Sequence, residues 1–145
     1  MSVIEAKVKI LLVDDHPANL IALSAVLADS VYELTEATSG AEALEFLERE
    51  PDVALILLDV QMPEMDGYEV ARRIRNDPRT RSIPIIFITA VYREEPYVRK
   101  GYEAGGQDYL GKPFDPDVLR AKVGVYSELF LKTSSLEKQT RKLME

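Results

Sequence analysis

The sequence contains no cysteine, which excludes a disulfide framework, a thiolate metal site and a cysteine nucleophile. It also has no long apolar run. The longest runs, residues 10–13 and 53–58, fall far short of the roughly 20 residues that cross a bilayer. Glu5, Lys7 and Lys9 stand where a signal peptide would need an apolar segment. We therefore expect a cytoplasmic protein that does not enter a membrane.

Basic residues are in deficit, with 18 Lys and Arg against 25 Asp and Glu and a net charge of −7. This balance argues against direct nucleic-acid binding, because neutralising phosphates requires an excess of Lys and Arg. The charge is unevenly spread. Residues 116–145 hold six bases and four acids, a net of +2, which leaves 12 bases and 21 acids, a net of −9, in residues 1–115. An acidic body is thus followed by a mildly basic end.

A chain of 145 residues matches the usual size of one domain, roughly 150 residues. Short β-branched or aliphatic segments alternate along it with helical patterns. The strand candidates are residues 8–13, 32–37, 53–58, 85–89 and 108–110. Three of them are almost continuously apolar, as strands buried on both faces should be. The alternation predicts an α/β fold, a doubly wound parallel sheet with helices on both faces.

Five helices are expected between and after these strands. Pro17 suits the first helical residue of one, and Ser39 can cap the next. A third helix is expected at residues 68–75 after Gly67, a fourth at residues 95–103, and a fifth begins at Pro116. The last has no further proline, so it can extend well past the domain.

Polar side chains follow the predicted strands, at the sheet edge where open α/β folds bind ligands. Asp14 and Asp15 follow the first strand, Asp59 the third, Thr89 ends the fourth, and Lys112 follows the fifth. Three neighbouring carboxylates repel one another, and a divalent cation removes that cost. Oxygen-only ligands favour Mg²⁺ (or Mn²⁺) over Zn²⁺.

In such a site Asp59 can act as a nucleophile that forms an acyl phosphate. Thr89 and Lys112 can then bind the oxygens of the incoming phosphoryl group.

Four motifs resemble the receiver domains of two-component response regulators, of the chemotaxis-regulator type. They are LLVDD at residues 11–15, DVQMPEMDG at 59–67, ITA at 88–90 and DYLGKPF at 108–114. Each motif alone is weak, but the four occur in the family's order and spacing over about residues 7–125. The resemblance implies a flavodoxin-like five-stranded sheet of order 2-1-3-4-5 with five helices.

The same resemblance implies roles for individual residues. Asp59 would be the phospho-acceptor, Asp15 a direct Mg²⁺ ligand assisted by Asp14, and the backbone carbonyl of Gln61 a further ligand. Thr89 matches the switch hydroxyl and Lys112 the lysine that pairs with the phosphoryl group. Tyr109 matches the aromatic switch, and Lys112-Pro113 is commonly a cis bond in the family.

The resemblance also implies the partners. The phosphoryl donor would be a phosphohistidine on a sensor histidine kinase or a histidine phosphotransfer protein, as in a phosphorelay. Phosphorylation would shift the conformation of the face formed by the fourth helix, the fifth strand and the fifth helix. A homodimer through this face or through the C-terminal helix is also possible. Such a domain catalyses only its own phosphorylation and dephosphorylation, so we do not expect an enzyme.

The basic end allows several interpretations. Leu129, Leu136 and Leu143 recur every seven residues, at coiled-coil spacing, although the intervening core positions are poor. We expect a tail at residues 1–6, a receiver domain at 7–125 and a helical linker or coiled-coil arm at 126–145. A solvated tail, a stand-alone regulator and a fragment of a longer protein all remain open.

Three other functions compete with this interpretation. A haloacid-dehalogenase-type phosphohydrolase needs an acid where Gln61 stands, and a flavodoxin phosphate loop is incompatible with Asp14 and Asp15. A scaffold that is never phosphorylated is the alternative that the sequence excludes least well. The single histidine, His16, is interpreted as a loop residue near the metal site rather than as a phosphohistidine or general base.

Overall fold

The computed structural model describes residues 7–90, 106 and 108–144, with side chains as far as Ser134. Five parallel strands form one sheet of order β2-β1-β3-β4-β5. The strands are β1 (Val8–Val13), β2 (Tyr32–Ala37), β3 (Leu55–Asp59), β4 (Ile85–Thr89) and β5 (Asp108–Gly111). The predicted fold and strand order are confirmed. The third strand, predicted at 53–58, begins later and ends on Asp59 itself.

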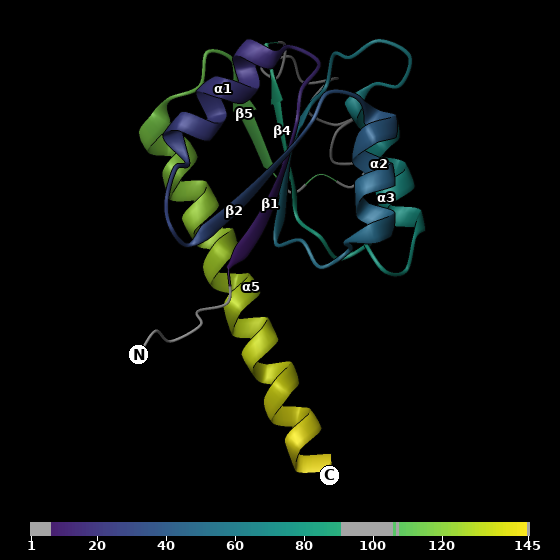
Figure 1. Cartoon of the computed structure of the whole chain (residues 1–145), viewed down its shortest axis with the longest axis vertical. Coiled ribbons are helices and arrows are strands. Elements are labelled where there is room, and N and C mark those ends of the chain that lie inside the picture. Colours follow the sequence, from purple (N-terminus) through teal and green to yellow (C-terminus); the bar gives the residue numbers. More distant parts are fainter. Residues whose placement is uncertain (1–6, 91–105, 107, 145) are drawn as a thin grey trace.

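Four helices lie in the described part of the chain, two on each face of the sheet (Figure 1). They are α1 (Pro17–Val26), α2 (Gly40–Arg49), α3 (Gly67–Asn76) and α5 (Pro116–Met144). Helices α1 and α5 cover one face, and α2 and α3 cover the other. The fourth predicted helix, at residues 95–103, lies outside the described residues.

Local chemistry explains where these helices begin. Pro17 occupies the first position of α1, where its missing N–H costs nothing. The Ser39 hydroxyl accepts a 3.1 Å hydrogen bond from the Glu42 backbone N–H, and the Asp66 carboxylate accepts one of 2.9 Å from Glu69. Each cap satisfies a backbone donor that the first turn would otherwise leave unpaired.

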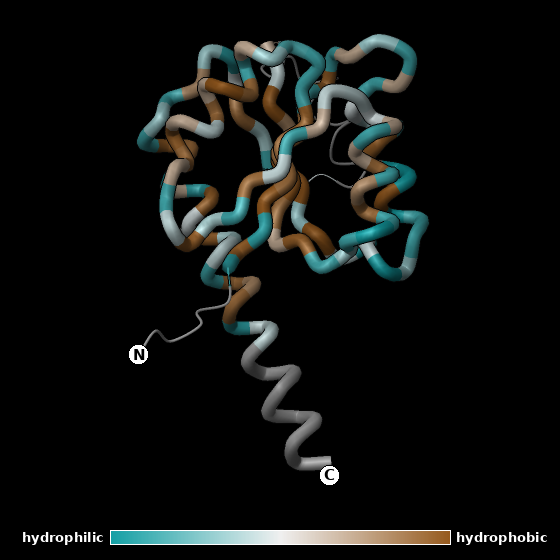
Figure 2. Tube along the Cα trace, viewed as in Figure 1, coloured by the Kyte–Doolittle hydropathy of each residue, from teal (hydrophilic) through white to brown (hydrophobic). Residues whose placement is uncertain are grey.

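Alternate residues of the strands enter two separate cores, because successive strand side chains point to opposite faces. Leu11, Ile56 and Phe87 pack under α2 and α3. Ile10 and Leu57 pack under α1 and α5. Figure 2 shows the apolar strands at the centre of the domain, between the helices. Burial on both faces explains why β3 and β4 are continuously apolar.

Helix α5 begins in this core and then leaves it. Its 29 residues span about 43 Å at 1.5 Å per residue. Leu119 and Val123 are fully buried, and Tyr126 and Phe130 still pack against the same core one and two turns later. Beyond them the helix projects past the sheet (Figure 1). Packing therefore continues past residue 125, where the sequence places the end of the domain.

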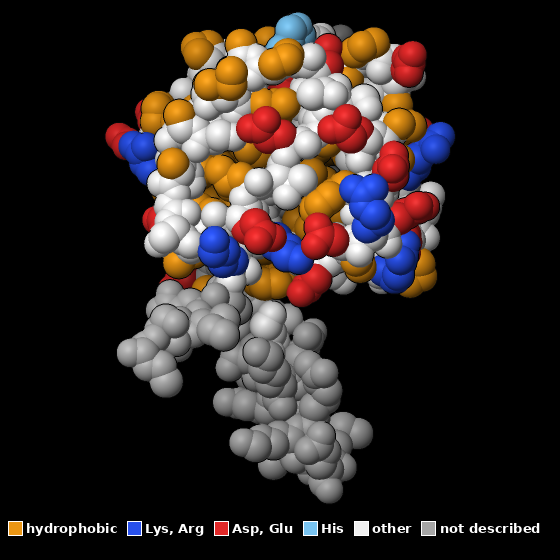
Figure 3. All heavy atoms as spheres, viewed as in Figure 1, with side chains coloured by type: hydrophobic (Ala, Val, Ile, Leu, Met, Phe, Trp, Pro, Cys, Tyr) orange, Lys and Arg blue, Asp and Glu red, His pale blue; other side chains and the backbone are white. Residues whose placement is uncertain are grey.

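One face of the domain is mixed in charge. On the face shown in Figure 3, acidic and basic side chains are interspersed with apolar ones.

Within the described residues, no helix is both long and apolar enough to span a membrane.

Gly67 is required where α3 passes the end of β3. A Cβ placed there would overlap the backbone carbonyl oxygen of Asp59 and lie 2.9 Å from Val60 Cα. The Gly67 N–H also donates a 2.9 Å hydrogen bond to the Val60 carbonyl. The small residue thus lets the start of α3 pack against the strand end that carries Asp59.

We expect Gly67→Ala to lower the free energy of unfolding by about 2–3 kcal/mol, because backbone must move to admit the methyl group. Gly124 is the matched control, since a Cβ there meets nothing within 4 Å in the interior of α5. Gly124→Ala should raise stability by about 0.5–1 kcal/mol. Urea denaturation measures both, and equal effects of the two substitutions would contradict this account.

Candidate functional site

The predicted site residues meet at the carboxyl edge of the sheet. Asp14 immediately follows β1 and extends its pairing, since its N–H donates a 3.1 Å hydrogen bond to the Ala37 carbonyl at the end of β2. Asp59 is the last residue of β3, the strand next to β1. Their side chains are 2% and 4% exposed. Two carboxylates are therefore held almost out of water, side by side, by neighbouring strands.

Lys112 joins these two carboxylates. Its Nζ donates a 3.0 Å hydrogen bond to Asp14 Oδ2 and one of 3.1 Å to Asp59 Oδ1. The Lys112 N–H in turn donates to the Thr89 carbonyl at 3.2 Å, which fixes the lysine backbone to the end of β4. The Lys112-Pro113 peptide is cis, as the resemblance implies. One ammonium thus neutralises part of the negative charge of two buried acids.

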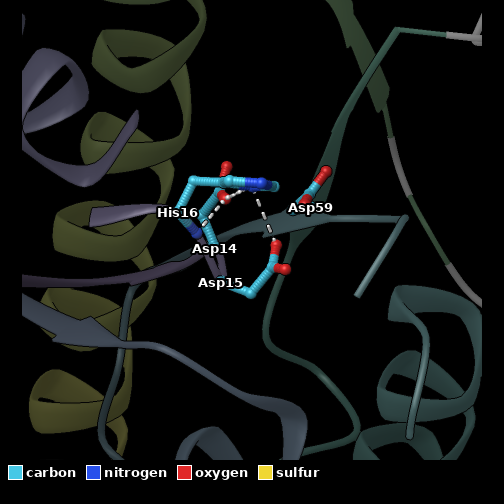
Figure 4. A group of neighbouring side chains, drawn as sticks. All are labelled: Asp14, Asp15, His16 and Asp59. Atoms are coloured by element: carbon cyan, nitrogen blue, oxygen red, sulfur yellow. Dashed lines mark hydrogen bonds and ion pairs between the residues drawn. The ribbon is translucent and has the colours of Figure 1, made fainter. Parts of the chain in front are cut away.

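Asp15 completes the acidic group, and His16 lies against it. Single ligand atoms of Asp14, Asp15, His16 and Asp59 all lie within 4.8 Å of one another (Figure 4). Asp15 Oδ1 is buried and accepts no hydrogen bond from the described residues. A buried carboxylate oxygen without a donor, among other carboxylates, is suited to a divalent cation. The residues present therefore fit the Mg²⁺ site expected from the sequence.

The electrostatics follow from burial and from this clustering. Desolvation, and then the negative charge of Asp14, raise the pKa of Asp59 to about 6, although Lys112 acts in the opposite direction. Burial alone would lower the pKa of Lys112. Hydrogen bonds and attraction from Asp14 and Asp59 outweigh burial and raise that pKa above its ordinary value. Lys112 therefore stays charged, and the pKa of Asp59 lies closer to neutral pH than that of an ordinary aspartate.

Thr89 and Gln61 lie at the same edge of the sheet. Thr89 ends β4 with its side chain buried, opposite Gly111 in the β4–β5 register. Gln61 follows β3 by two residues and is exposed. Both positions agree with those expected from the sequence, on strand ends that adjoin Asp59 and Lys112.

Tyr109 lies inward, in the middle of β5, and is 8% exposed. Its hydroxyl lies 3.3 Å from that of Tyr68 on α3, within hydrogen-bond distance. The Phe87 ring packs against both tyrosines, with centroid separations of 5.1 Å to Tyr68 and 5.4 Å to Tyr109. An aromatic chain therefore connects the predicted switch residue to α3, the helix that follows the Asp59 loop.

The sequence interpretation missed three contacts. Tyr68 was missed although it lies three residues before Ala71, on the buried face of α3. Asn19 donates a 3.1 Å hydrogen bond from Nδ2 to Asp14 Oδ2. Its position five residues after Asp14, in the first turn of a helix beginning at Pro17, was the available signal. The third contact is that of His16 with the two acids before it.

The raised pKa of Asp59 predicts how stability depends on pH. In metal-free protein, a native pKa of about 6 against an ordinary value of 3.8 means that the native state binds more protons between these values. The unfolding free energy from this group therefore falls as pH rises from about 4 to about 6, by at most about 3 kcal/mol.

The comparison with Asp59→Asn isolates this effect, because other carboxylates contribute to both proteins. Denaturant unfolding in EDTA should show the variant gaining stability relative to the natural chain across that pH range. A difference in stability that stays constant with pH would contradict the raised pKa.

Comparison with known proteins agrees with this geometry. The family model described as the response regulator receiver domain matches residues 10–124. Response regulator PleD of Caulobacter vibrioides is 44% identical over 116 residues, which are 79% of this chain and 25% of PleD. The chain thus spans about a quarter of the length of the first curated relatives that it matches.

Two solved structures are similar over most of the chain. Chemotaxis protein CheY4 of Vibrio cholerae is 30% identical with a TM-score of 0.77, over 83% of this chain and 99% of that one. The receiver domain of the sensor histidine kinase PA1611 of Pseudomonas aeruginosa is 33% identical with a TM-score of 0.76, over 85% and 99%. That structure has a magnesium ion coordinated in its active site cleft. With the acidic pocket and Lys112 in place, the chain belongs to the response regulator receiver domains, which are regulatory phospho-acceptors rather than enzymes.

Proposed function

We propose that Asp59 is the residue that accepts the phosphoryl group, and that the acceptance requires Mg²⁺. The observation that carries this proposal is the contact of Lys112 Nζ with both Asp14 and Asp59, beside an Asp15 oxygen that accepts no hydrogen bond from the described residues. A nucleophile, a cation site and a fixed positive charge are then adjacent at one sheet edge. This is the set of groups that in-line phosphoryl transfer needs.

In the proposed reaction, an Asp59 carboxylate oxygen attacks the phosphorus of a phosphohistidine. The new P–O bond forms as the P–N bond breaks, and the imidazole of the donor leaves and takes up a proton from solvent. Asp59 must be ionised to attack, and its pKa of about 6 leaves it largely ionised at neutral pH. Lys112 lies where it can stabilise charge on the transferred oxygens.

Mg²⁺ would be held by Asp14, Asp15, Asp59 and the backbone carbonyl of Gln61, with Asp14 acting through water. When bound, the ion screens the carboxylates from one another and from the incoming phosphoryl group. The part played by the chain is to hold these oxygens at the ends of β1 and β3. No protein nitrogen or sulfur ligand is needed for this cation.

The proposed conformational switch runs through Thr89 and Tyr109. A phosphoryl group on Asp59 would attract the Thr89 hydroxyl and Lys112, whose backbones are hydrogen-bonded to each other. Tyr109, three residues before Lys112, would report the change through its contacts with Phe87 and Tyr68. NMR spectra of the Tyr109 ring with and without the phosphoryl group test this; unchanged signals would contradict it. Phosphorylation would shift a population of two arrangements rather than create a new fold.

A receiver domain has a histidine kinase as its partner. We propose that the direct donor is a sensor histidine kinase or a histidine phosphotransfer protein, and that the reaction takes place in the cytoplasm. We also propose residues 126–145 as a helical arm that connects the receiver, residues 7–125, to a second copy or to another domain. Leu129 supports the arm, because this apolar side chain is 52% exposed, and Val125, one turn before it on the same face of α5, is 56% exposed.

Phosphorylation is tested by incubating the chain with acetyl phosphate and Mg²⁺ and measuring its intact mass. We expect one added phosphoryl group, none in Asp59→Asn, and none when EDTA replaces Mg²⁺. Asp117→Asn is the matched control, because that carboxylate is 88% exposed at the start of α5 and away from the acidic group. It should gain mass like the natural chain. A mass gain that persists in Asp59→Asn rules out Asp59 as the acceptor.

Self-association through α5 is tested by light scattering of the chain and of Val125→Glu/Leu129→Glu. If the arm dimerises, the natural chain should have about twice the mass of the variant, since charges on the contact face oppose association. Ile21→Glu is the control, as Ile21 is equally apolar and 69% exposed but lies on α1. A natural chain that is monomeric at every concentration would refute the dimeric arm.

A further inference from the structure

His16 lies beside the acidic group, and the proposed function gives it no role. Its Nδ1 is 3.1 Å from Asp15 Oδ1 and 3.4 Å from Asp14 Oδ1. Figure 4 shows the imidazole beside these carboxylates, with Asp59 facing the same space from the end of β3. It is the only histidine in the sequence. A nitrogen ligand thus stands at the entrance of a site whose other donors are oxygens.

The backbone holds His16 in this place. It is the residue before α1, with φ −104° and ψ 110°, and its N–H donates a 2.9 Å hydrogen bond to Asp14 Oδ1. Pro17 follows and restricts the chain further. The His16 side chain makes no capping hydrogen bond to α1, and it is 67% exposed. The imidazole is therefore tethered beside the acids and accessible to a hydrated ion.

The separations match those of ligands around one ion. Adjacent ligands of a six-coordinate ion at about 2.1 Å are separated by about 3.0 Å. The distances from Nδ1 to the two carboxylate oxygens, 3.1 and 3.4 Å, are close to this value. Asp15 Oδ1 accepts no hydrogen bond from the described residues, although His16 Nδ1 lies within ion-pair distance of it.

We propose that His16 Nδ1 is a ligand that shifts the cation preference of this site from Mg²⁺ towards borderline ions such as Co²⁺ and Ni²⁺. Mg²⁺ prefers oxygen and keeps several waters, so it gains little from an imidazole. Imidazole suits the later first-row ions, whose affinities also rise in that direction. The inference rests on the proposed cation site and does not require that Asp59 be phosphorylated.

Calorimetric titration of the untagged chain with Ni²⁺ and, separately, with Mg²⁺ tests the proposal. In His16→Ala, the Ni²⁺ dissociation constant should rise about tenfold or more, because losing a group that merely orients a ligand already costs 10–100-fold. The Mg²⁺ dissociation constant should stay within about twofold, since its ligands are oxygens. The visible spectrum of the Co²⁺-loaded chain should also shift in His16→Ala, as oxygen replaces nitrogen.

Asp15→Asn is the matched control, since it keeps His16 but removes the neighbouring carboxylate. It should weaken both cations, which distinguishes this site from Ni²⁺ binding to an isolated surface histidine. Equal losses of Ni²⁺ and Mg²⁺ affinity in His16→Ala would overturn the proposal, because His16 would then only position the acids. Unchanged Ni²⁺ affinity would overturn it too. A natural chain that binds neither cation would refute the underlying cation site, a separate result.

Discussion

The main constraint on this structure is that three carboxylates, those of Asp14, Asp15 and Asp59, lie close together at one edge of the sheet. The ammonium of Lys112 lies beside them. Two unit charges 4 Å apart interact by about 4 kcal/mol near a protein surface, so this grouping is costly unless positive charge accompanies it. Lys112 supplies part of that charge through contacts with Asp14 and Asp59, which are 98 and 53 residues away in sequence. Burial, and then the negative charge of Asp14, raise the pKa of Asp59, and the acidic group is suited to a divalent cation.

The fold makes this grouping possible because its strands are parallel and buried on both faces. Neighbouring strands β1 and β3 end at the same level, so Asp14 and Asp59 are adjacent without any loop having to place them. The close approach of Gly67 to the β3 carboxyl end allows α3 to begin directly behind the acid. Asp59 therefore lies on a strand and Asp14 continues the pairing of one, whereas Asp15, His16 and Lys112 lie on connecting segments.

The sequence predicts much of the fold and of the candidate site, because parallel strands buried on both faces leave a strong apolar pattern. The bounds of β1, β2 and β4 agree with those expected, and the three acids and Lys112 lie together at the predicted edge of the sheet, whereas Tyr109 lies within β5. The start of β3 was wrong because Val53 and Ala54 are buried, at 4% and 1% exposure, before the strand begins. An apolar run predicts which residues are buried, but it does not show where the hydrogen-bonded pairing of a strand begins. Contacts such as Tyr68 with Tyr109 depend on side-chain directions between distant elements, which periodicity does not encode.

In the proposed mechanism, Asp14 and Asp59 share the Lys112 ammonium, and the charge added by a phosphoryl group would displace this ammonium. Lys112 Nζ donates one hydrogen bond to Asp14 and one to Asp59, so each acid makes only part of the contact that fixes the ammonium. A phosphoryl group on Asp59 would add charge on one side of this balance only, and would draw the lysine away from Asp14. The Lys112 N–H is hydrogen-bonded to Thr89, and Tyr109 lies three residues earlier on β5, opposite Phe87 in the β4–β5 register. Displacement of Lys112 therefore acts on the ends of β4 and β5 together. A bound cation would offset the charge of Asp14 and Asp15, so Lys112 would be freer to follow the phosphoryl oxygens.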